Sequence, residues 1–146
     1  MKPEVDQILN LSAGQIMATL APHMPAGYAQ ATAGLTSFMM MFAAQEYDRA
    51  ADIRARENTE MRALFRELAP QLRDAALKRK LESAAATQDE SLKISALNET
   101  NSELRKLLIA LQIHLETLKD AHDARARIWD LLRTAAERRL LKLPGA

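Results

Sequence analysis

The stretch Thr87–Lys119, TQDESLKISALNETNSELRKLLIALQIHLETLK, decides the fold of this chain. Its apolar residues recur at alternating steps of three and four, a heptad pattern typical of a helix that packs along one side. They are Ile94, Leu97, Leu104, Leu108, Leu111, Leu115 and Leu118. A second apolar line, Ile109 and Ile113 with Ala110, lies roughly on the opposite side, because each residue turns a helix by about 100°. We therefore predict a central helix covered on two sides, by other helices of the chain or by a second subunit.

Two polar residues, Asn101 and His122, occupy positions in this heptad line. A buried amide must find a hydrogen-bond partner and so favours one alignment of helices, and we interpret Asn101 as such a device. His122 lies between Asp120 and Asp123, and we interpret it as a polar break in the pattern.

Beyond this break, Trp129, Leu132 and Ala136 continue the same heptad register. Two interpretations are open. The helix breaks near residues 120–123 and a terminal helix follows, or one helix continues to about residue 142 and pairs with another subunit. Pro144-Gly145 supplies the final stop signal.

The composition favours a single all-α domain. The chain has 146 residues, of which 48% are hydrophobic and only 4% aromatic, with four glycines and five prolines. Residues with good helix propensity dominate, while β-branched residues and turn formers are few. We predict an antiparallel helical bundle of four to five helices with a long central helix, forming one domain over residues 1–146.

The breaks in the pattern divide this domain into five parts. Residues 1–27 form an N-terminal helix and a proline-containing connector, 28–69 a long helix, and 70–86 a short helix. Residues 87–122 form the central helix and 123–143 the C-terminal helix. Thr87 and Glu90 have the spacing of a capping box, which predicts that the central helix begins there.

The predicted long helix is apolar in its first part and charged in its second. Its first part, Gly34–Ala44, is apolar all round and holds three consecutive methionines. It is too short to cross a membrane. It is either a fully buried segment or an adaptable binding surface, since methionine side chains are flexible and polarizable. From Gln45 onward the helix is highly charged, and two carboxylates, Glu46 and Glu57, fall on its apolar line.

The sequence carries no recognisable catalytic or metal-binding motif. Glu46 and Glu57 are eleven residues apart, about 16 Å along a helix, too far to act together on one bond. No Glu-x-x-His occurs, His114 and His122 cannot share a metal without a third element, and His23 stands in the connector. We predict a chain that is not an enzyme and that has no catalytic residues, no cofactor and no metal.

The charge pattern limits the partners that are expected. The 20 basic and 19 acidic side chains nearly cancel, so neither nucleic acid nor membrane is expected to bind. There is no cysteine, no basic and apolar leader at the N-terminus, and no apolar run of about 18 residues. We therefore expect a cytoplasmic protein.

The segment Leu97–Leu108, LNETNSELRKLL, contains the pattern Asn-x-x-Asn-x-x-Leu. Over about residues 91–118 it resembles FlgN-type flagellar export chaperones. This resemblance implies a small, cytoplasmic, all-helical protein whose amphipathic helices bind the termini of hook–filament junction proteins before export.

The sequence as a whole predicts a protein-binding module, an adaptor or export-chaperone-like protein, that docks a helix of a protein partner or self-associates as a homodimer. The predicted partner-binding residues are Phe38, Met39, Met40, Met41, Phe42, Ile109 and Ile113. One alternative is a bundle with a buried small-molecule or catalytic pocket, for which Glu46, Glu57, Asn101 and His114 are the polar candidates. The other alternative is a purely structural homodimer.

Overall fold

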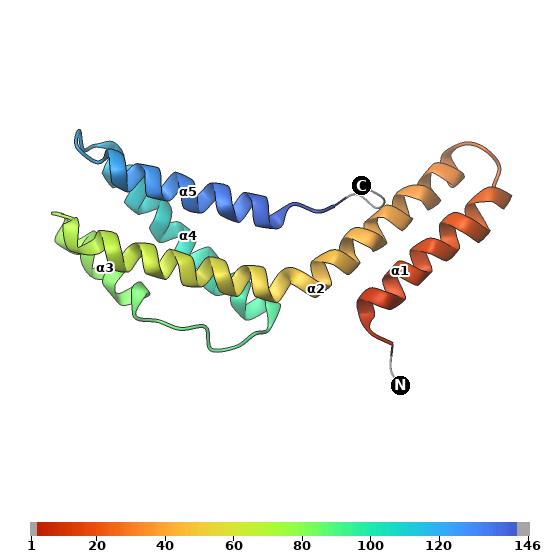
Figure 1. Ribbon diagram of the computed structural model, residues 1–146, viewed down its shortest axis with the longest axis horizontal. Helices are drawn as coiled ribbons and strands as arrows, with labels where there is room; N and C mark the ends of the chain where they lie inside the picture. The colour runs from red at the N-terminus through yellow and green to blue at the C-terminus, as the bar shows by residue number, and fades with distance from the viewer. Residues whose placement is uncertain (1–2, 143–146) are drawn as a thin grey trace. The chain divides into compact units, whose positions relative to one another are not determined.

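A computed structural model describes residues 3–142, and within them the fold is all-α without a β-strand (Figure 1). The all-α prediction is therefore confirmed. The five α-helices of this part of the chain are α1 (Val5–Gln15), α2 (Tyr28–Leu68), α3 (Ala75–Ala85), α4 (Ile94–Glu116) and α5 (His122–Arg139). A π-helical turn (Ile16–Leu20) and a 3-10 turn (Ala21–His23) follow α1, and a second 3-10 turn (Ala69–Gln71) follows α2.

The described chain divides into two compact units. The N-terminal unit contains residues 3–50 and 141–142, and the C-terminal unit contains residues 51–140. Helix α2 contributes its first part to one unit and its second part to the other. The single domain predicted over residues 1–146 stays a prediction, since each unit is described by itself.

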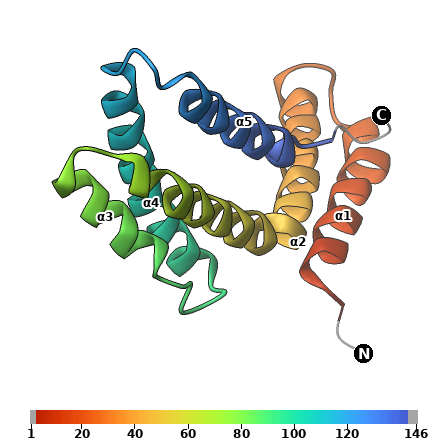
Figure 2. The ribbon, with the colours of Figure 1, turned by 60° about the vertical axis from the view of Figure 1, so that its left-hand side comes forward.

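Helices α3, α4 and α5 of the C-terminal unit gather around the second part of α2 (Figures 1 and 2). Their apolar faces form one core, and its most enclosed large side chains include Met61 and Phe65 of α2, Leu81 of α3, Leu111 of α4 and Ile128 of α5. Burying a side chain of this size contributes roughly 1.5–3 kcal/mol. This core therefore supplies most of the driving force for folding of the C-terminal unit.

The heptad line of α4 is buried as predicted, from Leu97 through Asn101 to Leu115, and its part from Leu104 onward belongs to this core. The two ends of the line, Ile94 and Leu118, are exposed. On the opposite flank Ile109 and Ile113 are 58% and 60% exposed, so the other helices of the C-terminal unit do not cover them; coverage by a second subunit, the other alternative, stays a prediction.

The predicted capping box at Thr87 and Glu90 is also wrong, because α4 begins only at Ile94. The Thr87 hydroxyl instead donates at 2.8 Å to the carbonyl oxygen of Ala84 near the end of α3, which also accepts a hydrogen bond of 3.2 Å from the Thr87 backbone amide. Residues 87–93 run as a loop along α2. The reason lies in Asp89, whose carboxylate accepts hydrogen bonds from two side chains of α2.

The expected break between α4 and α5 is present, since α4 ends at Glu116 and α5 begins at His122. The break shifts the helical phase of α5 relative to α4. Ile128 and Ala135 are buried in α5, whereas Trp129 and Ala136 are exposed. The predicted continuation of the heptad register through Trp129 and Ala136 is therefore wrong. The stop signal at Pro144-Gly145 lies outside the described residues.

In the N-terminal unit, α1 and the first part of α2 lie side by side in both views (Figures 1 and 2). The chain reverses between them through the two short turns and Gly27. Gly27 has φ of 140°, a conformation that is strained for any residue with a side chain. Gln30 donates to the carbonyl oxygen of Ala21 at 3.1 Å and ties the start of α2 to the connector. We call residues 5–45 the N-terminal hairpin.

Candidate protein-binding surface

The buried residues of the N-terminal hairpin are small. Ala13 of α1 and Ala33, Ser37 and Ala44 of α2 are almost fully buried. Ser37 satisfies its hydroxyl within α2, donating to the carbonyl oxygen of Ala33 at 3.0 Å. Because the buried positions are small, few of the large apolar side chains of this segment are used to hold the hairpin together.

Several large apolar side chains of α2 in this hairpin are exposed. Leu35, Phe38, Met39 and Phe42 follow the spacing i, i+3, i+4 and i+7, which places them on one side of the helix. Leu35 and Met39 are 62% and 63% exposed, Phe38 is exposed and Phe42 is half-buried. This set, named the α2 stripe, lies on average about 180° around the helix from the buried small residues.

The hairpin also lacks charge beyond Asp6 in its first turn. Residues 7–45 contain no Asp, Glu, Lys or Arg, although the whole chain has 39 such side chains, 20 basic and 19 acidic. An exposed apolar surface within an uncharged segment is unusual for a protein that works alone, because solubility is normally secured by charged side chains. Such a surface typically marks a site of protein–protein contact.

An apolar groove lies at the connector end of the same hairpin. It has a volume of about 470 Å³ and is lined by residues that include Ile16 and Leu20 of the π-helical turn, Met24 of the connector, and Tyr28 and Ala33 of α2. A groove of this size accommodates one or two large apolar side chains.

Of the predicted partner-binding residues, Phe38 and Met39 are exposed, whereas Met40, Met41 and Phe42 are half-buried. The segment is therefore not the fully buried one that the sequence also allowed. Ile109 and Ile113 are exposed on α4 of the C-terminal unit. The two groups belong to different units, and their role in binding stays a prediction.

The C-terminal unit has a different polar feature, a buried carboxylate at Glu57 of α2. Arg139 of α5 donates two hydrogen bonds to it, each of 2.6 Å. On α4, Asn101 Nδ2 donates to Glu57 Oε2 at 3.1 Å and Arg105 donates to the same oxygen at 3.3 Å. Burial works to raise the pKa of Glu57, but the hydrogen bonds and charge of Arg139, with the donors on α4, outweigh it and lower the pKa below its ordinary value.

The network extends from Glu57 to the loop before α4. Asn58 Oδ1 accepts a hydrogen bond of 2.9 Å from Asn101, and its Nδ2 donates to Asp89 at 3.0 Å. The Asp89 carboxylate also accepts from Arg62 at 2.8 Å, and Arg62 donates to Thr87 at 3.0 Å. These contacts join α2, the loop, α4 and α5. The interpretation of Asn101 as a residue that aligns helices accords with its place at the centre of this network.

The alternative of a buried pocket required several polar candidates to converge. Glu57 and Asn101 do meet, but the hollow beside Glu57 has a volume of only about 10 Å³, too small for more than one water. Glu46 belongs to the N-terminal unit. His114 is thirteen residues beyond Asn101, about 20 Å along α4. The convergence therefore leaves no room for a ligand.

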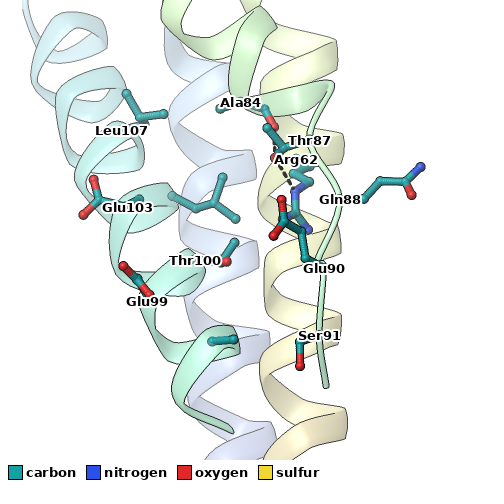
Figure 3. Close-up of a pocket in the computed structure, with 12 residues that line it drawn as sticks. Arg62, Ala84, Thr87, Gln88, Glu90, Ser91, Glu99, Thr100, Glu103 and Leu107 are labelled. Atoms are coloured by element: carbon teal, nitrogen blue, oxygen red, sulfur yellow. Dashed lines mark hydrogen bonds between the residues drawn. The ribbon is translucent and has the colours of Figure 1, made fainter. Parts of the chain in front are cut away.

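An open groove of about 380 Å³ lies between α4 and the loop that precedes it (Figure 3). Arg62 lies at its inner wall, already engaged by Thr87 and Asp89. Glu99 and Glu103 line the groove from α4, and Lys106 forms an ion pair of 2.6 Å with Glu103. The only cation among the lining residues thus has its partners, so the groove offers no free positive charge to an acidic ligand.

Sequence reasoning missed two features of these surfaces. The uncharged run over residues 7–45 is visible without a structure. The pairing of Glu57 with Arg139 is not, because the two residues are 82 positions apart and no local pattern links them.

Comparison with protein-family models, with curated proteins and with solved structures gave no match to this chain. Within residues 3–142, no helix is long and apolar enough to cross a membrane.

Proposed function

We propose that this chain is a non-enzymatic protein-binding module of the adaptor or chaperone type, which docks a helix of its partner on the N-terminal hairpin. The observation that supports the proposal best is the α2 stripe, in which Leu35, Phe38 and Met39 are exposed and Phe42 is half-buried while small residues are buried. Its spacing is that of the anchor residues in helix-to-helix docking.

The binding free energy comes from removing this apolar surface from water. Leu35, Phe38 and Met39 are each partly exposed, so that docking recovers roughly half of the 1.5–3 kcal/mol that full burial of each side chain contributes. The cost of association offsets several kcal/mol of this gain. We therefore expect the stripe alone to bind weakly and reversibly, and more tightly where the partner also fills the apolar groove beside Tyr28.

Methionine suits this role, because its unbranched side chain adapts to differently shaped partners. Met39 is the exposed member of the three consecutive methionines, and Met40 and Met41 are half-buried. We propose the cytoplasm as the compartment, because FlgN-type chaperones, which residues 91–118 resemble, act there.

Site-specific photocrosslinking of the full-length chain tests the proposal. A benzophenone amino acid replaces Leu35 in one variant and Trp129, an exposed apolar residue of the C-terminal unit, in a matched control. Irradiation in the cells that produce the protein is followed by mass analysis of the adducts. A discrete polypeptide adduct at position 35 that is absent at position 129 supports the proposal. No adduct at position 35, or the same set of adducts at both positions, contradicts it.

A further inference from the structure

The occupant of the α2 stripe can be argued from its chemistry. A partner recognised by charge would need counter-charges on the hairpin, and residues 7–45 contain no Asp, Glu, Lys or Arg. A helix that lies on a membrane surface normally carries Lys and Arg on its polar face, and this hairpin carries neither over the same residues. What remains is an uncharged apolar surface of another protein.

A second copy of the chain supplies such a surface. In a two-fold symmetric contact each patch meets its own image, so a charged patch repels itself while an uncharged apolar patch is self-complementary. The α2 stripe meets this condition along its whole length, from Leu35 to Phe42. Two-fold dimers are also the commonest closed assemblies of identical chains.

The spacing of the stripe fits an antiparallel pair of helices. Its four positions are symmetric about the midpoint between Phe38 and Met39. A two-fold axis at that midpoint places Leu35 of one chain opposite Phe42 of the other, and Phe38 opposite Met39 of the other. Each contact then joins two large apolar side chains of similar volume, which is the condition for close packing without a cavity.

We infer that the α2 stripe is the interface of an antiparallel homodimer, in which two N-terminal hairpins pack together as a four-helix bundle. The inference rests on the proposed function and names its partner. The stripe is about 10 Å long between Leu35 and Phe42, shorter than a standard interface of roughly 800 Å² per chain requires. The dimer is therefore weak and reversible.

Oligomeric state is measured first, by light scattering coupled to size-exclusion chromatography on the full-length chain. We expect the mass to rise from that of one chain at about 1 µM towards that of two chains at about 100 µM, as mass action requires for a weak dimer. Met39→Lys should weaken the dimer at least tenfold, since it places two like charges beside the axis. The matched control, Trp129→Lys, changes an equally exposed residue of the C-terminal unit that is not among the predicted partner-binding residues, and it should leave the dimer unchanged. Circular dichroism confirms that both variants keep their helix content.

Cysteine variants then test the antiparallel arrangement, because the chain contains no cysteine of its own. Mild oxidation of a mixture of Leu35→Cys and Phe42→Cys chains should give a mixed disulfide in preference to either self-pair, and Met39→Cys should pair with itself. Preferential self-pairing at position 35 indicates parallel helices and overturns the inference. A monomer at every concentration, or equal weakening of the dimer by Trp129→Lys, also overturns the inference.

The photocrosslinking experiment separates failure of this inference from failure of the proposed function. If the chain is monomeric and the adduct at position 35 contains a different polypeptide, the homodimer is wrong while the docking function stands. If the chain is monomeric and position 35 gives no adduct, both are wrong.

Discussion

Replacing Glu57 by Gln should destabilise the C-terminal unit by about 2–3 kcal/mol at pH 7. Removing one partner of a buried ion pair typically costs about 3–5 kcal/mol. The Glu57 side chain is only 2% exposed, but Arg139 and Arg105 are 38% and 42% exposed and recover part of their hydration in the variant. The expected cost therefore lies below that range. The shape of the side chain is unchanged, so the loss reports on charge and hydrogen bonding.

The free energy of unfolding is measured by urea denaturation, followed by far-ultraviolet circular dichroism. The matched control is Glu67→Gln. It makes the same change on the same helix, and Glu67 also pairs with an arginine of α5, Arg127, but both of those side chains are exposed. Exposed pairs contribute little, so we expect the control to lose less than about 0.5 kcal/mol.

The pH dependence of the difference between wild type and Glu57→Gln provides a second readout. The pKa of Glu57 is lowered in the folded state, so its ionised form stabilises the protein above the ordinary carboxyl pKa of about 4.3. This stabilisation is lost as the pH falls through the lower pKa of the folded state. The difference should therefore be constant near neutral pH and shrink under acid. A difference no larger than that of Glu67→Gln, or one that does not change with pH, would refute the reasoning.

Three further outcomes are expected. Phe65→Ala should lower the free energy of unfolding in urea by about 3–5 kcal/mol, because Phe65 is fully enclosed. Phe38→Ala on the exposed stripe should lower it by less than about 1 kcal/mol, and similar losses in the two variants would contradict this difference in burial. Asp89→Ala should release residues 87–93 from α2, because it removes the carboxylate that pairs with Arg62. Amide hydrogen exchange should then become faster in this loop, and unchanged exchange there would count against the network. Asp74→Ala should speed amide exchange at the start of α3 at pH values above the ordinary carboxyl pKa and have less effect below it. The reason is that hydrogen bonds from the Leu77 and Ala76 amides lower the pKa of Asp74. An effect on exchange that does not depend on pH would argue against this cap.

Local patterns predicted the helices well where the chain buries one continuous face. The heptad line of α4 is an example, because Leu97 to Leu115 pack against neighbours within the same unit. The pattern failed where a tertiary contact competes with a local one. Thr87 and Glu90 have the spacing of a cap, but Asp89 between them is engaged by Arg62 and Asn58, and this holds the segment as a loop.

The candidate site was predicted only in part, for a physical reason. Periodicity identifies a side of a helix, but it does not say which side has a neighbour. Ile109 and Ile113 therefore have the same sequence signature as covered residues, although the described chain leaves them exposed. Phe38 and Met39 were identified by composition, but their grouping with Leu35 in one stripe emerged only once Ala33 and Ser37 were found buried on the opposite side.

The pairing of Glu57 with Arg139 has a consequence for biosynthesis. The carboxylate is made 82 residues before the guanidinium that neutralises it. At a translation rate of about 5–20 residues per second, roughly 4–16 s pass between the synthesis of Glu57 and that of Arg139. During that interval α5 is missing, and the face of α2 that it covers is open to solvent on the nascent chain. The C-terminal unit therefore completes its folding only after Arg139 has been made, and truncation before Arg139 should leave a chain that is prone to aggregate.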